Sequence, residues 1–561
     1  MSCSCWGRPC CPGSYERGCA DRLVVLNVVK ALGVAVVTVL FVCGCARVGP
    51  DYVRPVPPVV GEWREAHDAR VKTDPAEYRA WWEVFGDPAL ERIIDHVYRN
   101  NLSLQIAGVR VMEARARLGI AVGGLFPQSQ FAEGSLVFNR SSARSSVTAR
   151  QAALDLSTWE DRIGLGAAWE LDFWGKFRRA VEAADANLQG AVADYDNALV
   201  SLTADAAALY VQIRTIGKRL EIARRNVETQ KESLEIAEAR FRGGTTTQRD
   251  VEQARTVLYS TQAAIPLLEA QLRQAENALS VLMGLPPGGA EPFLEGPAAI
   301  PVPPPQVAVG IPADLLRRRP DVRSAEFQAM AQSAQVGVAR ADLFPAFSLS
   351  GSFGFLSTDV GAFKLSDMFT WEARTGSVGP SFRWDILNYG RLTNRVRVED
   401  ARLQQLLLAY RDAVLRAQRE VEDALTAYLR AQENAELLAR SADAAQRSLD
   451  LAFVQYRQGI TDFTTVLTAQ QALQNIQDGL AGALGGIGIN LVALYRALGG
   501  GWQVREGEEF ISPEIREVME KRTHWGRLLA PAPHAAQPPS MATPVRSPDP
   551  GAAAAGSNPS N

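Results

Sequence analysis

Histidine is scarce in this chain, and cysteine is confined to its beginning. Only four of the 561 residues are histidine, and all seven cysteines fall within the first 45 positions. The histidines are not spaced as metal ligands or as members of a catalytic triad. They are His67, His96, His524 and His534. Gly243 and Gly244 lack the lysine and the strand-to-helix context of a phosphate-binding loop. The sequence therefore predicts no catalytic residue, no metal site and no cofactor.

Neither sign of charge predominates. The chain has 59 lysines and arginines against 62 aspartates and glutamates, a formal net charge of −3, which leaves no basic surplus for nucleic acid. Glu170 and Asp172 fall on the polar face of a predicted strand, where charges are expected in any case. Glu420 and Glu422 are two positions apart on a predicted helix and do not face each other. The composition favours a passive conduit over an enzyme.

The start of the chain predicts export and attachment to a membrane. After Lys30, the apolar run 31–44 is too short to span a bilayer and has the length of a signal-peptide core. The run ends in Val-Cys-Gly-Cys, which resembles a bacterial lipoprotein box and implies that Cys45 is the acylated first residue of the mature chain. The cysteine-rich stretch from Met1 to Arg22 is either a metal-binding cluster or a segment upstream of the true start; it lacks the paired spacing of a zinc site.

The chain contains a tandem duplication, in which residues recur 215 positions apart over more than a hundred residues. The matching pairs are Trp169 and Trp384, Gly175 and Gly390, Tyr195 and Tyr410, Phe241 and Tyr456, Gly244 and Gly459, Thr246 and Thr461, Ala254 and Ala469, and Gly284 and Gly499. A constant separation indicates two units of the same architecture. Each unit is predicted to contain a strand pair, a very long helix, a glycine turn and a second long helix.

Apolar residues in each unit recur every three and four positions, which is the period of about 3.5 of a supercoiled helix seam. In the first unit the seam begins at Val181, Leu188 and Val192 and runs to Phe241. A helix from Lys176 to Phe241 would span about 100 Å, longer than the core of a single domain. The seam resumes after each glycine turn, so two antiparallel pairs of long helices are expected.

The segment before each long helix changes to a period of two. Apolar residues alternate with small or charged residues from Ile163 to Phe173 and from Val378 to Ile386, and an upstream strand precedes each segment. Phe126-Pro127 and Phe344-Pro345 open the upstream strands at a separation of 218. The alternation fits both a membrane barrel and a soluble sandwich. Four strands cannot close a barrel, and no other segment supplies a second sheet, so we expect other copies of the chain to close it.

Motifs along the chain carry a family resemblance. They are Cys45 to Tyr52 with Arg54-Pro55, Trp81-Trp82 followed by Phe85 to Pro88, the Leu-Phe-Pro before each strand pair, Trp169 to Gly175, Phe241 to Gly244, Pro312 to Asp321, and Tyr456 to Gly459. Together they resemble the TolC-like outer membrane efflux lipoproteins, the NodT group of outer membrane factors. The resemblance covers residues 45 to 502 in uninterrupted order.

The resemblance implies an α+β membrane protein that assembles as a homotrimer. Three chains with four strands each would form a 12-stranded outer membrane β-barrel, continued by a long periplasmic α-helical barrel. The segments are 1–44, leader and lipoprotein signal peptide; 45–125, lipidated N-terminus, equatorial part and first helix; 126–285, first repeat; 286–342, proline-rich linker and helix; 343–502, second repeat; 503–528, equatorial C-terminal segment; and 529–561, disordered tail.

The function implied by the resemblance is that of the outer membrane channel of a tripartite efflux pump, a passive conduit for drugs or other small molecules. Its partners would be further copies of itself, a periplasmic membrane fusion adaptor, an inner membrane transporter of the RND type and outer membrane lipids. Two alternatives are the outer membrane duct of a type I protein secretion system and a lipid-anchored coiled-coil structural protein without a channel. The latter explains the seams but not the alternating strands.

The glycine turns are expected to form periplasmic tips that contact the adaptor. The tip residues are Gly243, Gly244, Thr245, Thr246, Gly459, Ile460, Thr461 and Asp462. Helix capping explains the same residue types, with Gly244 and a threonine at the first tip and Gly459 and Thr461 at the second.

A periplasmic gate is expected just after the second tip. Relatives often place an acidic residue before the Ala-Gln that follows this tip, with a basic residue nearby. This chain has Thr468 and Gln471 in those places. We therefore expect Thr464, Thr468 and Gln471 to close the channel through hydrogen bonds and not through ion pairs; the alternative is that Thr464 and Thr468 are solvated helix positions.

Overall fold

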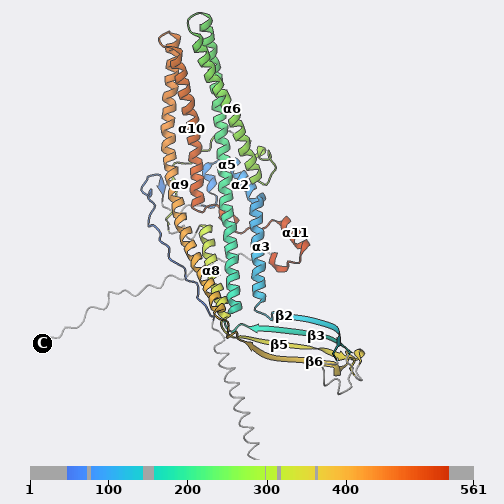
Figure 1. Cartoon of the computed structure of the whole chain (residues 1–561). Coiled ribbons are helices and arrows are strands. Elements are labelled where there is room, and N and C mark those ends of the chain that lie inside the picture. The colour runs from blue at the N-terminus through green and yellow to red at the C-terminus, as the bar shows by residue number, and fades with distance from the viewer. Residues whose placement is uncertain are drawn as a thin grey trace, which may run out of the picture. The chain divides into compact units, whose positions relative to one another are not determined.

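The computed structural model of the chain describes residues 47–72, 78–142, 157–296, 299–312, 318–360 and 364–529 (Figure 1). The signal peptide, Cys45 and the tail from residue 530 lie outside the described residues. The chain forms two compact units, one ending at Val504 and one beginning at Arg505. The second unit contains α11 (Pro513–Arg522), which begins at a Ser512 side-chain cap. All strands and all other α-helices of the described chain lie in the first unit.

The predicted duplication is confirmed in the long helices. Helices α5 (Lys176–Arg242) and α9 (Arg391–Arg457) each have 67 residues, and α6 (Gln248–Leu282) and α10 (Phe463–Ala497) each have 35. Both pairs start and end 215 positions apart. At about 1.5 Å per residue, α5 and α9 extend for about 100 Å. Figure 1 shows two hairpins side by side, α5 with α6 and α9 with α10.

Each copy begins one helix earlier than the sequence indicated. Helices α3 (Leu102–Gly123) and α8 (Pro320–Ala341) each have 22 residues and lie 218 positions apart. Helix α3 packs along α5, and α8 packs against both α5 and α9. The buried face of α8 consists mainly of alanine, serine, glycine and valine, so its apolar pattern is weak in the sequence.

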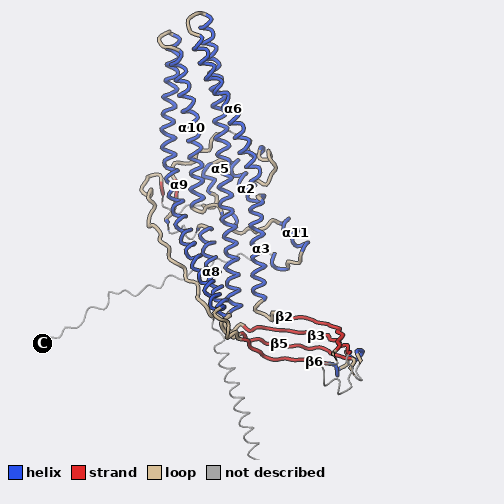
Figure 2. Tube along the Cα trace, in the orientation of Figure 1, coloured by secondary structure: helices blue, strands red, loops and turns tan. Residues whose placement is uncertain are grey.

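Four strands form one antiparallel sheet in the order β2, β3, β5, β6. They are β2 (Ser129–Arg140), β3 (Ser157–Leu171), β5 (Ala346–Thr358) and β6 (Arg374–Arg383). Strand β3 of the first copy pairs with β5 of the second, so the two hairpins join at the centre of the sheet. Strands β2 and β6 are its edges within the described chain. Figure 2 shows the strands extending together from the end of the helices opposite the tips.

Two strands end earlier than the alternation predicted. Strand β3 ends at Leu171 and not at Phe173, and β6 ends at Arg383 and not at Ile386. The backbone turns there, because the Phe173 N–H donates to Leu171 O and the Ile386 N–H donates to Trp384 O. Such bonds between residues two apart are γ-turns, which are common at strand ends. The turn residues continue the alternation of apolar and polar side chains. The alternation therefore predicted strands that are longer than the observed ones.

The two faces of the sheet differ as the alternation predicted. One face carries large apolar side chains that are exposed in the single chain; Leu165, Phe353 and Val378 are 65%, 50% and 83% exposed. On the opposite face, β5 and β6 carry mainly glycine and serine, including Ser350 and Ser352, whereas β2 and β3 add charged residues such as Glu133, Glu160 and Arg162. This is the division between a lipid-facing and a lumen-facing surface in a membrane barrel.

The predicted seam is buried along the middle of α5 but not at its start. In the middle, Tyr195, Leu199, Leu202, Ala206 and Ile213 are buried. At the start, Val181, Leu188 and Val192 are only half-buried. The buried residues there are instead Arg179, Ala183, Ala186, Gly190 and Ala193. Small side chains on this face allow α8 to approach closely; a Cβ on Gly190 would lie 3.7 Å from the Cβ of Phe327.

Two of the three segments predicted to form an equatorial region, Glu62 to about Leu90 and the linker Pro286 to Pro312, meet in the fold; the third is the segment after Trp502. Strand β1 (Val71–Lys72) pairs in parallel with β4 (Val307–Ala308). The 3-10 helix η1 (Trp81–Phe85) and helix α2 (Pro88–Asn100) follow β1 in the chain. Trp81, which is 1% exposed, stacks on Tyr495 of α10 with 5.2 Å between ring centroids.

Helix α10 is the one helix of the described chain that is long and apolar enough, by length and composition, to cross a membrane. Half of its most apolar window, which has a mean hydropathy of 1.4, is buried inside the protein. The helix packs along α9 and α5. Its apolar residues are therefore those of a core helix.

Candidate functional site at the helical tips and the base of the sheet

Each long helix reverses at a glycine in the left-handed backbone region. Gly244 has a φ of 70° and Gly459 a φ of 74°. The Thr245 N–H donates to Arg240 O, and the Ile460 N–H donates to Gln455 O; these bonds define Schellman motifs. A Cβ added at either glycine would meet no atom within 4 Å. Glycine is therefore required at the tips by backbone conformation and not by crowding.

The helices after the tips begin at side-chain caps. Thr247 and Asp250 form a capping box at the start of α6, and Asp462 accepts a hydrogen bond from the Thr465 N–H at the start of α10. The prediction that Thr461 caps α10 is wrong. Its hydroxyl instead donates to Thr465 Oγ1 at 2.9 Å.

The threonines of the first tip form hydrogen bonds within the tip. Thr245 Oγ1 donates to Arg240 O at 3.0 Å, and the Thr246 hydroxyl donates to the Asp250 carboxylate. Burial opposes the charge on Asp250, but hydrogen bonds from Thr246 and Thr247 outweigh it and lower its pKa. Of the predicted tip residues, Thr246 and Thr461 are half-buried; the exposed ones are Gly243, Gly244, Thr245, Gly459, Ile460 and Asp462.

The two tips pack on a shared apolar cluster centred on Tyr456 and Phe463, whose ring centroids are 5.1 Å apart. Arg240 of the first tip lies over the Tyr456 ring at 4.1 Å and donates to Arg457 O at 3.1 Å. Phe241, the counterpart of Tyr456, does not join the seam as predicted. It is 44% exposed, whereas Tyr456 is 3% exposed.

The predicted gate residues lie on α10 soon after the second tip. Thr464 is half-buried, and Thr468 and Gln471 are exposed. Thr468 Oγ1 donates to Thr464 O at 2.9 Å, and both threonines line a groove of about 480 Å³ together with Asp462 and Thr465. The structure thus brings Thr464 and Thr468 together, whereas Gln471 is not among the residues that line the groove.

A line of polar contacts between α10 and the first hairpin was not predicted. The contacts are Ser233 with Gln470 at 2.6 Å, Gln230 with Gln474 at 3.1 Å, and Arg219 with Asp478 at 2.7 and 2.9 Å. Hydrogen bonding to Asp478 raises the pKa of Arg219. The signal in the sequence was the recurrence of Gln470, Gln474 and Asp478 every four positions, which places the three side chains on one face of the helix.

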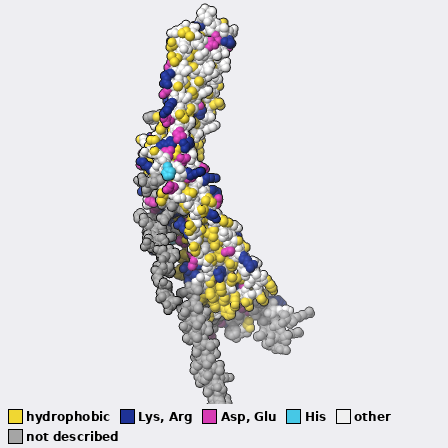
Figure 3. Space-filling model, turned by 90° about the vertical axis from the view of Figure 1, so that its left-hand side faces the viewer, with side chains coloured by type: hydrophobic (Ala, Val, Ile, Leu, Met, Phe, Trp, Pro, Cys, Tyr) yellow, Lys and Arg dark blue, Asp and Glu magenta, His cyan; other side chains and the backbone are white. Residues whose placement is uncertain are grey.

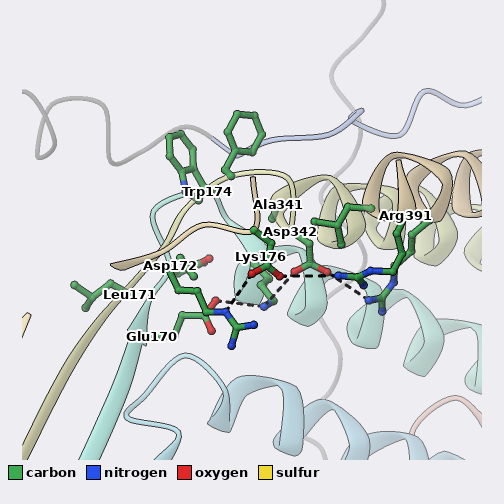
Figure 4. A pocket seen from close by; sticks show the side chains of 14 residues that line it. Glu170, Leu171, Asp172, Trp174, Lys176, Ala341, Asp342 and Arg391 are labelled. Atoms are coloured by element: carbon green, nitrogen blue, oxygen red, sulfur yellow. Dashed lines mark hydrogen bonds and ion pairs between the residues drawn. The ribbon is translucent and has the colours of Figure 1, made fainter. Parts of the chain in front are cut away.

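A cavity of about 280 Å³ lies where the sheet meets α5 and α9 (Figure 4). Lys176 Nζ lies 3.3 Å from both Glu170 and Asp342 at its wall. Asp172 binds Arg178 at 2.9 Å. The two neighbouring carboxylates at 170 and 172 are therefore members of separate ion pairs. Among the described residues, no group of three or more histidine, cysteine, aspartate or glutamate side chains could hold a metal ion.

Both copies of the duplicated unit match known proteins. The family model "Outer membrane efflux protein" matches residues 93–285 and 311–500. The chain is 31% identical to the pyoverdine export outer membrane protein OpmQ of Pseudomonas putida KT2440 over 469 residues, 80% of this chain and 94% of that protein. It is 30% identical to nodulation protein T of Rhizobium leguminosarum bv. viciae over 492 residues, 87% of this chain and 96% of that protein.

A solved structure of the outer-membrane channel OprN superposes with a TM-score of 0.76 at 33% identity, covering 81% of this chain and 99% of that one. The predicted resemblance and the predicted combination of strands, long helices and internal duplication are confirmed. Both the family match and this structure place the protein in the outer membrane. The chain belongs to the outer membrane efflux protein family and is the outer membrane channel component of an efflux system.

Proposed function

We propose that three copies of this chain join their sheets edge to edge into a 12-stranded barrel, and that their long helices continue it as an α-helical barrel through the periplasm. The observation that carries this proposal is the open sheet. Its apolar face is exposed, and β2 and β6 are edges within the described chain. A barrel in lipid has no edges, so β6 of one chain pairs with β2 of the next.

The number of copies follows from the lumen-facing surface. Two copies would give eight strands, and a barrel of about eight strands is filled by its own side chains. The lumen-facing residues of β5 and β6 are mainly glycine and serine, and these small side chains leave the interior open. Three copies are the smallest number that produces a conduit.

The channel conducts drugs or other small molecules without chemical change. The tips dock to a periplasmic membrane fusion adaptor, which joins the channel to an inner membrane transporter of the RND type. The exposed tip residues, at the end of the helices opposite the sheet (Figure 1), support this contact. The named export of pyoverdine by a relative supports a small-molecule cargo.

Purified full-length protein in detergent tests the channel. We expect a trimer that resists dodecyl sulfate until heated, and discrete conductance steps in planar bilayers. A monomeric protein without conductance would contradict the channel and would favour a lipid-anchored coiled-coil structural protein.

Cys45→Ser is expected to remove the acyl chains but to leave trimers in the outer membrane. A lipid anchor adds only modest attachment compared with a spanning barrel. Metabolic labelling with palmitate and membrane fractionation measure both effects. A Cys45→Ser protein found soluble in the periplasm would show that the sheet does not span the membrane.

Thr464→Ala combined with Thr468→Ala is expected to raise single-channel conductance and sensitivity to vancomycin. Each hydroxyl bond contributes only about 1 kcal/mol, and opening should depend little on salt because no ion pair is screened at these residues. Thr256→Ala is the matched control, since its exposed hydroxyl donates to Glu252 O at 2.8 Å on α6. Unchanged conductance in the double variant, or strongly salt-dependent opening of the unmodified channel, would assign closure to other contacts such as Arg219–Asp478.

A further inference from the structure

Tyr389 lies at the turn between β6 and α9 and points away from its own chain. It is 98% exposed, and it is the one non-glycine residue with a positive φ, 50°, among the described residues. A bulky residue in this backbone region is uncommon and strained, and such residues concentrate at functional positions.

The counterpart of Tyr389 in the first copy is Trp174, 215 positions earlier. Trp174 is half-buried against the second copy of its own chain. Its ring stacks on Phe344 with 4.7 Å between centroids, and its Nε1–H donates to Pro345 O at 2.8 Å. Figure 4 shows Trp174 above the ion pairs at the base of the sheet.

The counterpart of Phe344-Pro345 is Phe126-Pro127, 218 positions earlier. Phe126 is 61% exposed. Phe126 precedes β2 and Tyr389 follows β6, and these strands are the opposite edges of the sheet with β3 and β5 between them. The surface that matches Tyr389 therefore belongs to another copy of the chain.

We propose that Tyr389 of one chain packs on Phe126-Pro127 of the neighbouring copy and repeats between chains the Trp174–Phe344 stack found within each chain. This contact rests on the proposed assembly of the channel from several copies. It assigns to one exposed tyrosine the contact between subunits at the base of the barrel.

Strand pairing supports the same geometry. Ala168 of β3 lies opposite Ser350 of β5. The counterpart of Ala168 in β6 is Arg383, 215 positions later. The counterpart of Ser350 in β2 is Glu133, 217 positions earlier, because a shift of 217 keeps the apolar residues of β2 and β5 on the same face of the sheet. Pairing β6 with β2 of the next copy in this register places Arg383 opposite Glu133. The strand pairing between subunits therefore brings opposite charges together.

The helix faces also match. Ala183 and Ala193 of α5 are 0% exposed against α8, whereas their counterparts Val398 and Leu408 of α9 are 49% and 55% exposed. The counterpart of α8 is α3, whose Ile106 is 55% exposed. Figure 3, which views the α9 side, shows hydrophobic side chains gathered over the lower part of this face. A neighbouring α3 would cover α9 as α8 covers α5.

A cysteine pair tests the contact directly, because residues 46–561 contain no cysteine. Phe126→Cys with Tyr389→Cys, oxidised in membranes, is expected to give covalent dimers and trimers on denaturing gels. Trp174→Cys with Phe344→Cys is the matched pair within one chain and should form a bond without increasing mass. Tyr389→Cys with Tyr259→Cys should give no oligomer, since Tyr259 lies on α6.

The outcomes separate this contact from the channel itself. A monomeric unmodified protein would contradict the proposed function. An unmodified trimer whose Phe126→Cys, Tyr389→Cys pair does not cross-link would overturn the Tyr389 contact alone.

Tyr389→Gly provides a second measurement. Glycine relieves the backbone strain at this φ, so any loss of trimer stability comes from the missing ring. We expect dissociation of the trimer to become at least about tenfold more favourable, while Tyr389→Phe keeps most of the stability. A Tyr389→Gly trimer as stable as the unmodified one would overturn the contact; Tyr259→Ala controls for loss of an exposed tyrosine ring.

Discussion

Gly244→Val and Gly459→Val are each expected to abolish export while trimers continue to form. Both glycines hold left-handed φ values, 70° and 74°, where a β-branched residue is a strong outlier. The helix can no longer end in the same turn, so the exposed residues of the tip move away from the adaptor. Export is measured as drug resistance in a strain that lacks the native gene. Trimers are measured on unheated gels, because the sheet that joins the subunits is at the other end of the helices.

Gly243→Ala is the matched control at the same tip. Gly243 has a φ of −79°, and a Cβ there would meet its nearest atom at an ordinary 3.6 Å. Export should stay close to that of the unmodified protein. Normal resistance in both valine variants would contradict docking at the tips, and loss of export in Gly243→Ala would show that the tip surface, and not its turn, is sensitive.

Arg319→Ala is expected to destabilise the folded chain by about 3 kcal/mol. The Arg319 side chain is 9% exposed, and it binds Asp321 at 2.6 Å and Glu420 at 2.7 Å. It also donates to Ala497 O at the end of α10, at 2.8 Å. Burial opposes the charge, but the hydrogen bonds and charges of both carboxylates outweigh it and raise the Arg319 pKa. The expected loss of stability is at the low end of the range for breaking a buried ion pair, because the side chains of Asp321 and Glu420 are 33% and 43% exposed.

The first copy offers a control without charge. Asn101 stands 218 positions before Arg319, and its Nδ2 donates to Leu282 O at the end of α6, at 2.8 Å. Asn101→Ala removes this bond and the cap of α3, at a combined cost of about 2 kcal/mol. Thermal unfolding in detergent compares the two variants. Arg319→Met with Asp321→Asn and Glu420→Gln should recover part of the loss; equal destabilisation by the two alanine variants would show that the ion pairs contribute little.

The lengths of the helices could be read from the sequence, whereas their contacts could not. Glycines marked the ends of α5 and α9, and the repeat at 215 positions checked each end against the other copy. The start of the α5 seam was wrong because Ala183 and Gly190 face α8, and small residues there carry little apolar signal. How closely two helices can pack depends on the side chains of both helices. The residue pattern of one helix does not show which residues of its partner it will meet.

The same limit applies to the candidate site. Both tips lie where the sequence placed them, because the local turn requires Gly244 and Gly459. The contact of Arg240 with Tyr456 joins residues more than two hundred positions apart and leaves no local pattern. The cap at Asp462 was missed because Thr461 and Asp462 are both suitable cap residues, and the backbone decides between them.

The equal lengths of the corresponding helices also restrict how the length of this channel can change. One heptad added to α5 alone would displace the first tip by about 10 Å and would leave Tyr456 without Arg240. Deleting a heptad from α9 alone would produce the same offset between the tips, because it would draw the second tip back by about 10 Å. A longer or shorter relative must therefore carry insertions or deletions in register in all four long helices, and a single unmatched length change is the mutation that this architecture tolerates least.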